Sequence, residues 1–353
     1  MLSDNLSSKI LTIGCDYRYP KGGVAQVMWN YSHYIFPEFK CIINSGSKNK
    51  IINIFIGVNA LVRTIITLIK DSKIKIIHTH TASYNSFWRS SLFINVAKLF
   101  NKKVILHIHG GGFKRFYASS PKKISKILNN CDTLIVLSEN WRNYFQNIVS
   151  NPNIEIANNI VPFPSINKTP LHKISTIHLL FLGQISEEKG IFDLLSVIID
   201  NKSSFKNKIC LHIGGIGNIQ KLTETIENNG ISDIVKYVGW ISGDEKINIL
   251  NSSDIFILPS YVEGLPVSIL EAMSYKMPII STPVGGIPEI VKDNINGYLI
   301  KPGDKNGLSW AINDLINNPS KIAQMGDESY NLVSPYFPNY IENQLIEIYN
   351  KLL

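Results

Sequence analysis

The chain has 353 residues, of which 44% are hydrophobic and 18% charged, and its formal net charge is +8. This length exceeds what one hydrophobic core normally supports, and the composition excludes a disordered chain, so we expect two globular domains. The four cysteines form neither a CxxC pair nor a metal-binding spacing with histidine, which favours reduced thiols in a cytosolic protein over a disulfide framework or a zinc site. The first eight residues lack the apolar core of a signal peptide, so we do not expect export.

The charge is unevenly distributed along the chain. Residues 1–170 carry 21 Lys or Arg against 7 Asp or Glu, whereas residues 171–353 carry 14 Lys against 20 Asp or Glu, and all five arginines lie in the first part. A basic half beside an acidic half indicates that the first domain meets an anionic surface, such as a membrane or a nucleic acid. A basic but merely soluble surface, with no anionic partner, is the alternative.

The most apolar stretch of the chain, residues 51–69, contains Asn53, Asn59 and Arg63. These polar residues argue against a membrane-spanning helix, which needs about 20 residues with almost no charge. The stretch therefore predicts an amphipathic helix packed on the domain, with a helix that lies in a membrane interface as the alternative.

Short apolar segments alternate with helical patterns along nearly the whole chain, which is typical of the parallel sheets of α/β domains. In the first half we expect strands at 10–14, 74–78, 104–108 and 134–137. In the second half we expect strands at 177–182, 209–213, 235–238, 255–258, 279–281 and 297–300. The glycines at 214, 215 and 217 lack the third glycine of a dinucleotide-binding fingerprint, so we interpret them as a turn after a strand.

Pro162, Pro164 and Pro170 interrupt this alternation and indicate a linker. We therefore expect an α/β protein of two Rossmann-like, doubly wound domains that face each other across a cleft, one over residues 1–165 and one over residues 173–335. Such folds bind ligands at the carboxyl ends of their strands. Residues 336–353 have apolar residues at helical spacing, which predicts a terminal helix that packs back toward the N-terminal domain.

The segment that follows the strand at 255–258 places two carboxylates beside the start of a helix. It reads PSYVEGLPVSILE, with Glu263 in the loop, Pro266 where the helix should begin and Glu271 on the second helical turn. Proline suits the first helical position, and the free N–H groups of a helix N-terminus attract an anion. Because carboxylates accept hydrogen bonds from diols, the segment fits a nucleotide sugar, which carries hydroxyls on either side of a diphosphate. Taken alone, the two glutamates could equally be exposed surface charges.

A second segment, FLGQISEEKG at residues 181–190, opens the C-terminal domain with a strand and a glycine turn. The apolar residues that follow fall on one face of a helix, which we expect to begin near Lys189. A lysine at this position can add its point charge to the N–H groups beneath a diphosphate, or it can be an ordinary surface charge.

Together these segments resemble the retaining GT-B glycosyltransferases of family 4, also called glycosyl transferases group 1. EGLPVSILE, with seven residues between its two glutamates, is similar to the family's signature, and GQISEEKG is similar to its phosphate-binding loop. The segment STPVGGIPEIVKDNINGYLIKPGD at 281–304, and the strand ends IIHTH at 76–80 and LHIHG at 106–110, also resemble the family. The resemblance covers nearly the whole chain, and the motifs occur in the family's order.

The resemblance implies a role for each matching residue. Glu271 would hold the ribose hydroxyls, Lys189 would neutralise the diphosphate, and His109, unless it is purely structural, would approach the transferred sugar. Glu263 would hold the donor sugar without acting as a covalent nucleophile, so His109, Lys189 and Glu263 are the candidate catalytic residues. The backbone groups of Gly264, Leu265 and Pro266 are further candidates for donor binding, and Trp240 would line the base. The glycines Gly22 and Gly23 are also candidate donor-binding residues, although an ordinary tight turn would explain them as well.

One position departs from the family pattern. Gln184, also a candidate donor-binding residue, stands where the family usually has an arginine beside the diphosphate. A glutamine donates hydrogen bonds but brings no charge, so Lys189 and helix dipoles must provide most of the neutralisation. The resemblance implies a nucleotide-diphosphate sugar as co-substrate, a hydroxyl acceptor, and neither a protein-bound metal nor another cofactor.

The basic first half indicates where such an enzyme would work. It suggests a lipid-linked saccharide acceptor, and a cytoplasmic protein in peripheral contact with the inner face of the plasma membrane, as in the synthesis of a bacterial capsule, O-antigen or exopolysaccharide. The sequence contains no recognised nucleic-acid-binding motif, so we do not expect nucleic acid as a partner. A nucleotide-sugar 2-epimerase of the same fold and a non-catalytic partner subunit remain as alternatives.

Overall fold

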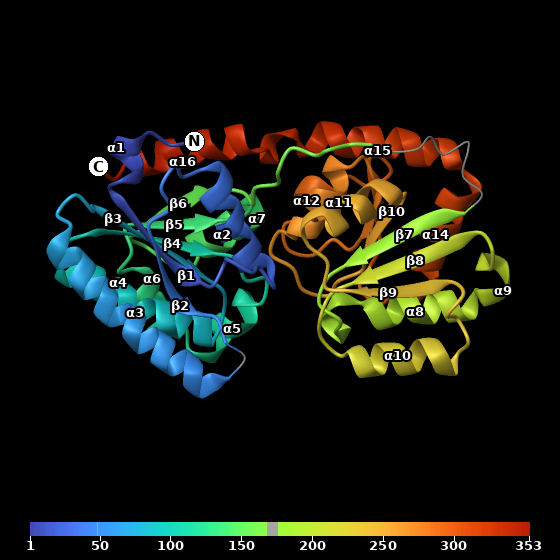
Figure 1. Ribbon diagram of the computed structural model, residues 1–353, viewed down its shortest axis with the longest axis horizontal. Helices are drawn as coiled ribbons and strands as arrows, with labels where there is room; N and C mark the ends of the chain where they lie inside the picture. Colours follow the sequence, from blue (N-terminus) through green and yellow to red (C-terminus); the bar gives the residue numbers. More distant parts are fainter. Residues whose placement is uncertain (48, 168–175) are drawn as a thin grey trace. The chain divides into compact units, whose positions relative to one another are not determined.

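The computed structural model describes residues 1–47, 49–167 and 176–353, and the chain divides into two compact units (Figure 1). The first unit comprises Met1–Pro162 and Tyr336–Leu353, and the second comprises Phe163–Pro335. The chain passes from the first unit to the second within the expected linker, of which Pro170 lies outside the described residues. The C-terminal helix α16 (Pro338–Asn350) belongs to the first unit.

The first unit is built on a parallel sheet of six strands in the order β2-β1-β3-β4-β5-β6. Its strands are β1 (Ile10–Cys15), β2 (Cys41–Ser45), β3 (Ile76–Thr81), β4 (Lys103–Ile108), β5 (Thr133–Val136) and β6 (Asn153–Ile156). The four strands expected in this half correspond to β1, β3, β4 and β5. The sequence pattern did not indicate β2 and β6, which form the two edges of the sheet and are less buried than the central strands.

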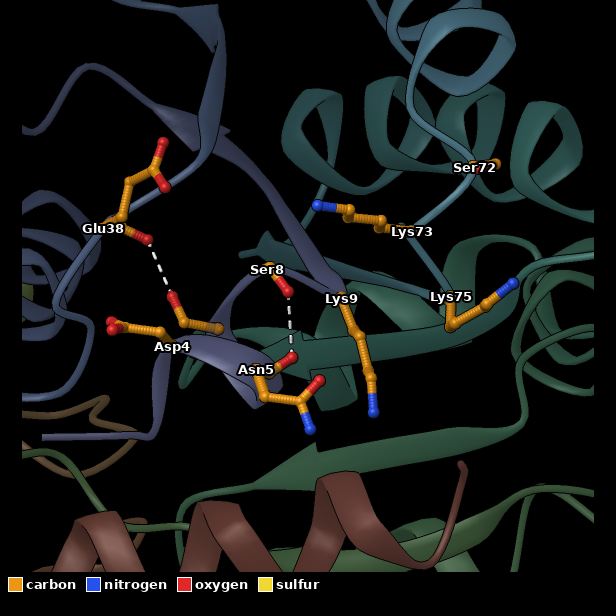
Figure 2. A pocket seen from close by; sticks show the side chains of 9 residues that line it. Asp4, Asn5, Ser8, Lys9, Glu38, Ser72, Lys73 and Lys75 are labelled. Atoms are coloured by element: carbon orange, nitrogen blue, oxygen red, sulfur yellow. Dashed lines mark hydrogen bonds between the residues drawn. The ribbon is translucent and has the colours of Figure 1, made fainter.

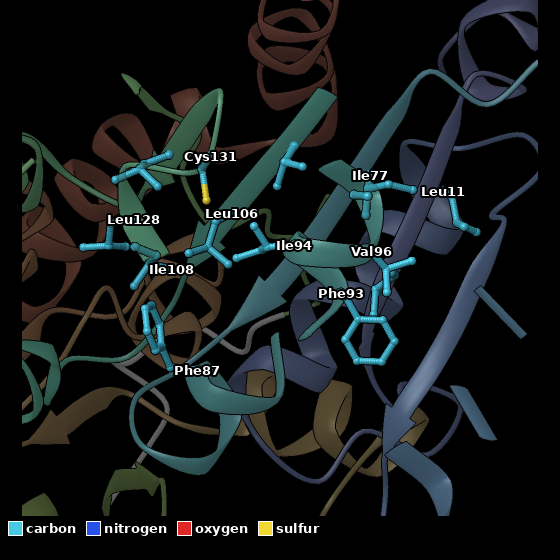
Figure 3. Packing of buried hydrophobic residues seen from close by; sticks show 14 of the residues in the cluster. Leu11, Ile77, Phe87, Phe93, Ile94, Val96, Leu106, Ile108, Leu128 and Cys131 are labelled. Atoms are coloured by element: carbon cyan, nitrogen blue, oxygen red, sulfur yellow. The ribbon is translucent and has the colours of Figure 1, made fainter. Parts of the chain in front are cut away.

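Helices surround this sheet and enclose one hydrophobic core. They are α1 (Asp4–Ser7), α2 (Gly23–Tyr34), α3 (Lys50–Lys70), α4 (Asn85–Leu99), α5 (Phe113–Ser119), α6 (Pro121–Leu128) and α7 (Glu139–Gln146). Figure 3 shows Leu11, Ile77 and Leu106 of three central strands packing with Phe93 and Ile94 of α4. Because the central strands are buried on both faces, their sequences are nearly continuous apolar runs.

The second unit has a parallel sheet of six strands in the order β12-β11-β10-β7-β8-β9. Its strands are β7 (Ile177–Leu182), β8 (Ile209–Gly214), β9 (Val235–Gly239), β10 (Ile255–Leu258), β11 (Ile279–Ser281) and β12 (Gly297–Leu299). All six were expected from the sequence, to within one residue at each end. The chain builds the sheet outward from β7 in one direction and from β10 in the other, so the order reverses between these two neighbours, where doubly wound sheets bind ligands.

The helices of the second unit follow its strands. They are the 3₁₀ turn Glu187–Lys189, α8 (Ile191–Asp200), α9 (Lys202–Phe205), α10 (Ile219–Asn228), α11 (Gly243–Ser252), α12 (Val267–Ser274), α13 (Ile287–Ile290), α14 (Lys305–Asn317) and α15 (Pro319–Val333). α8 packs against α14, and α12 packs against α15. The two sheets with their helices confirm the expected fold class of two doubly wound α/β domains.

A helix was expected over residues 51–69, and α3 is that helix, but it is less closely packed on the domain than expected. Only Ala60, Thr64 and Leu68 of its 21 residues are buried, and most of its large apolar side chains are exposed. The expectation of a helix packed on the domain is therefore wrong for most of its surface. Among the described residues, α3 is the one helix that is long and apolar enough to cross a membrane.

Candidate functional site

The two segments singled out in the C-terminal half lie side by side in the second unit. β7 and β10 pair in parallel, so the loops that follow them leave the same edge of the sheet, at the point where the strand order reverses. A Cβ atom on Gly190, whose φ is 69°, would lie 2.1 Å from the carbonyl oxygen of Pro259, and the Tyr261 N–H donates to the Glu188 carbonyl at 2.8 Å. Only glycine permits this close approach, which brings Lys189 to the loop that carries Glu263.

Lys189 and Glu263 form a direct ion pair. The Lys189 Nζ lies 2.5 Å from Glu263 Oε1, and the Ser260 hydroxyl donates to the same oxygen at 2.9 Å. Glu263 is only 9% exposed, so its interpretation as an exposed surface charge is wrong. Lys189 ends the 3₁₀ turn, and α8 begins two residues later at Ile191, because Gly190 adopts a left-handed conformation between them.

The segment after β11 supports the backbone around Glu263. The Ser281 hydroxyl donates to the Leu258 carbonyl at 2.6 Å, and the Gly286 N–H donates to the Gly264 carbonyl at 2.6 Å. Gly285 has a φ of 59°, and a Cβ atom there would lie 2.1 Å from the Glu263 carbonyl oxygen. The two glycines of STPVGG therefore allow the loop after β11 to pack closely against the loop after β10 that carries Glu263.

Glu271 lies on the second turn of α12, as expected, and is 6% exposed. Its Oε1 lies 2.5 Å from the Nζ of Lys246 on α11, a partner that was not expected from the sequence. Lys246 is one of 14 lysines in the second half and has no local motif that would single it out. Pro266 immediately precedes the helix rather than occupying its first position, and Gly264, Leu265 and Pro266 are all buried.

The site thus contains two nearly buried carboxylates, each neutralised by a lysine. Removing one partner of a buried ion pair leaves an uncompensated charge, so each lysine stabilises the carboxylate that it contacts. A carboxylate with a free lone pair can accept hydrogen bonds from a diol, and a lysine beside a helix N-terminus can attract an anion. The arrangement can therefore hold a ligand that carries both hydroxyls and phosphates.

Two other candidate residues of this unit are exposed. Gln184 is exposed in the loop after β7. Trp240 is 37% exposed and follows the edge strand β9, which β8 separates from β7. Both side chains are thus accessible to a ligand, although neither is packed into the group formed by Lys189 and the glutamates.

The remaining candidates, Gly22, Gly23 and His109, belong to the first unit. Gly22, with a φ of 149°, directly precedes α2, which begins at Gly23. His109 follows β4, and its Nε2 lies 2.9 Å from the Nδ1 of His80 on the neighbouring strand β3. His80 was not expected as a partner of His109, although the strand ends IIHTH and LHIHG place their histidines at the same spacing.

His109 ends a column of stacked histidine rings from two neighbouring strands, with His78 and His80 on β3 and His107 on β4. At the far end, the His78 Nδ1 lies 2.8 Å from the hydroxyl of Tyr349 on α16. Burial lowers the pKa of His78 and of His109 to about 3, and it lowers the pKa of His80 and His107 well below the usual range. His109 is therefore a neutral hydrogen-bonding group at physiological pH rather than a cation.

Two groups among the described residues bring three potential metal ligands within 4.8 Å of one another. The first consists of His78, His80 and His107, whose rings already contact one another in the core. The second consists of the half-buried His178, Cys210 and His212 on β7 and β8. Burial raises the pKa of the Cys210 thiol and lowers the pKa of His212, and the positive charge of the nearby Lys236 would also oppose a metal ion there.

A surface pocket lies elsewhere in the first unit, at the amino ends of β1 and β3 (Figure 2). It is lined by α1 residues and by Lys9, Glu38, Lys73 and Lys75. Because doubly wound sheets bind ligands at the carboxyl ends of their strands, this pocket is at the wrong edge of the sheet to be the ligand site.

The fold and the site define a two-domain glycosyltransferase of the GT-B class, and comparison with known proteins agrees. The family described as glycosyl transferases group 1 matches residues 166–332, and the family described as glycosyltransferase family 4 matches residues 47–162. One of the two matches falls in each unit, and the chain belongs to the family 4, or group 1, glycosyltransferases. This confirms the resemblance found in its motifs.

Individual relatives are distant. An uncharacterized glycosyltransferase of Methanocaldococcus jannaschii is 26% identical over 74% of this chain and 71% of its own length. The amylovoran biosynthesis glycosyltransferase AmsK of Erwinia amylovora is 27% identical over 50% of this chain, and the match spans 45% of AmsK. Among solved structures, HepE of Anabaena in complex with UDP has a TM-score of 0.76 at 15% identity, over 97% of this chain and all of HepE. The last likeness concerns the fold alone.

Proposed function

We propose that this glycosyltransferase moves a sugar from a nucleotide-diphosphate donor to a hydroxyl of a lipid-linked saccharide, with retention of configuration, in the synthesis of a bacterial surface polysaccharide. The observation that carries the proposal is the pair of buried carboxylates, Glu263 and Glu271, at the switch point of the second sheet. The UDP bound to HepE supports a nucleotide donor, and the biosynthetic role of AmsK supports a polysaccharide product.

Each residue has one task in the proposed reaction. Glu271 accepts hydrogen bonds from the ribose hydroxyls, Glu263 orients the donor sugar, and Lys189 shares its charge between Glu263 and the diphosphate. As the bond from the anomeric carbon to the diphosphate breaks, the acceptor oxygen bonds to the same face of that carbon. The acceptor proton passes to the departing phosphate oxygen. The protein thus acts by positioning and by stabilising charge, without a protein-bound metal or a glycosyl-enzyme intermediate.

His109 contributes a neutral imidazole to this proposal. Because its pKa is about 3, it can accept or donate a hydrogen bond to a sugar hydroxyl but adds no positive charge. The hydrogen bond to His80 orients the ring. The charge on the diphosphate is then balanced by Lys189 and by the N-terminal N–H groups of α12.

Thermal-shift measurements with a panel of nucleotides and nucleotide sugars, UDP included, test the donor. A ligand at about 100 times its dissociation constant stabilises the binding unit by about 2.7 kcal/mol, which raises its melting temperature by several degrees. Glu271→Gln is the matched variant and should lose most of this shift. A panel in which no nucleotide raises the melting temperature would contradict the proposal.

Product analysis with the donor so identified separates the remaining alternatives. Transfer to a lipid-linked saccharide, with an unchanged anomeric configuration by NMR, is the expected result. Conversion of the donor sugar without any acceptor would indicate a 2-epimerase. Nucleotide binding without turnover on any acceptor would indicate a non-catalytic partner subunit, for which the uncharged Gln184 is the specific reason to test.

A further inference from the structure

Helix α3 presents an unusual surface to water. Ile51, Phe55, Val58, Val62, Ile66 and Ile69 are all exposed, Phe55 by 70% and Ile69 by 67%. At 100° per residue, these six positions fall within about 80° of one another around the helix, so they form one stripe along its whole length. The buried Ala60 and Thr64 lie on the opposite side, against the domain. We call these six residues the α3 stripe.

The neighbouring helix extends the apolar surface. α4 packs against α3, and the two run next to each other in Figure 1. Trp88, Leu92 and Leu99 of α4 are exposed at helical spacing. Large apolar side chains exposed at helical spacing on two neighbouring helices indicate an interaction surface rather than scattered single residues.

The charges of this part of the chain indicate what the stripe meets. Residues 39–131 carry sixteen Lys or Arg and a single carboxylate, Asp71, which already pairs with Lys40 at 3.0 Å. Arg63 and Lys70 lie along one side of the stripe on the helix itself, and both are exposed. Apolar side chains beside basic ones match the boundary between the acyl chains and the phosphates of an anionic bilayer. Two copies meeting through this face would instead bring like charges together.

We propose that α3 lies in the headgroup–acyl boundary of an anionic phospholipid bilayer, with the α3 stripe inserted and Arg63 and Lys70 on lipid phosphates. The buried Ala60, Thr64 and Leu68 hold the helix to the domain, so it lies in the membrane surface and does not span it. This names the surface for the membrane contact that the basic first half leads us to expect, and it rests on the proposed function only in that a lipid-linked acceptor places the enzyme at a bilayer.

Vesicle co-sedimentation of the full chain, without donor or acceptor, tests the inference. Vesicles of phosphatidylglycerol and phosphatidylcholine should bind the protein, and pure phosphatidylcholine vesicles should bind it weakly. The double variant Phe55→Asn, Val62→Asn should lower the partition coefficient about a hundredfold, since each lost apolar anchor is worth about tenfold. Ile295→Asn, which removes a side chain 51% exposed in the second unit, is the matched control and should bind as the wild type does.

A second double variant separates the contribution of charge from that of apolar insertion. Arg63→Ala with Lys70→Ala should weaken binding to anionic vesicles about fivefold per residue and leave binding to neutral vesicles unchanged. Raising the salt to about 0.5 M should remove this charge-dependent part, because it screens the phosphates, and leave the stripe-dependent part.

Three outcomes would overturn the inference. The first is a wild-type protein that stays in the supernatant with anionic vesicles at low salt. The second is a stripe variant that binds the vesicles as well as the wild type does. The third is a dimer in solution that the stripe substitutions dissociate, which would assign the surface to a second copy. The nucleotide-induced thermal shift of the stripe variant should equal that of the wild type, so a failure of membrane binding is distinguishable from a failure of the proposed function.

Discussion

Lowering the pH from 7 to 5.5 should destabilise the first unit through its histidine column. His78, His80, His107 and His109 are kept neutral by burial, whereas a histidine in an unfolded chain has a pKa of about 6.5. Below that value, and above the lowered pKa of the folded state, the unfolded chain binds more protons than the folded one. The free energy of unfolding therefore falls as the pH drops through this window.

The size of the effect follows from the two pKa values near 3. Relative to pH 7, a histidine that stays neutral in the folded state at pH 5.5 costs about 1 kcal/mol, so His78 and His109 together cost about 2 kcal/mol. His80 and His107 act in the same direction and add to this. Carboxylates titrate below this window and contribute little. A loss of this size is a large part of the 5–15 kcal/mol that typically stabilises a domain.

Urea unfolding followed by tryptophan fluorescence measures the effect in the first unit alone. The substitutions Trp240→Phe and Trp310→Phe leave tryptophans only at 29, 88 and 141, all of which belong to the first unit. The midpoint should shift to lower urea at pH 5.5 while the slope m stays constant. His78→Gln should reduce the loss between the two pH values by about 1 kcal/mol, however much it weakens the protein at pH 7.

His33→Gln, at an exposed position on α2, is the matched control and should keep the full pH dependence. Equal stability of the first unit at pH 7 and 5.5 would refute the reasoning, as would a His78→Gln variant with the wild-type pH dependence. Either result would mean that the folded protein accommodates charged histidines.

Four substitutions test the residues of the second unit. Glu271→Ala should weaken donor binding by about 1.5–3 kcal/mol in calorimetry, because charged hydrogen bonds to the ribose are lost, and an unchanged affinity would exclude that contact. Lys189→Ala should lower the turnover number about 10²–10³-fold in initial-rate assays, and near-normal turnover would assign the diphosphate to other groups. Gln184→Arg should tighten donor binding by restoring a charge, and weaker binding would show that the loop has diverged. Lys246→Met should lower the free energy of unfolding by about 2–3 kcal/mol in urea, because it leaves the Glu271 carboxylate nearly buried without its cation, and an unchanged midpoint would show that the pair is dispensable.

The sequence by itself determined the strand pattern of both sheets, apart from two edges, and the family of the chain. Central strands are buried on both faces, so they read as short apolar runs such as Ile255–Leu258 whatever surrounds them. β2 and β6 could not be predicted in this way. Each has a neighbouring strand on one side only and is partly exposed, so its sequence is not a continuous apolar run. Loop glycines such as Gly190 also stand out in a sequence, because they mark where a backbone must come close to another.

Only the tertiary structure decided which side chains meet. Lys246 pairs with Glu271 across 25 residues of sequence, and no local pattern indicates that α11 and α12 bring them together. The helical spacing of residues 51–69 is the same whether the stripe is packed or exposed, so its exposure follows from where α3 sits on the domain. The neutral state of His109 likewise depends on burial beside His80 and His107. Burial and charge compensation arise from contacts between distant parts of the chain, and therefore appear only once the fold has formed.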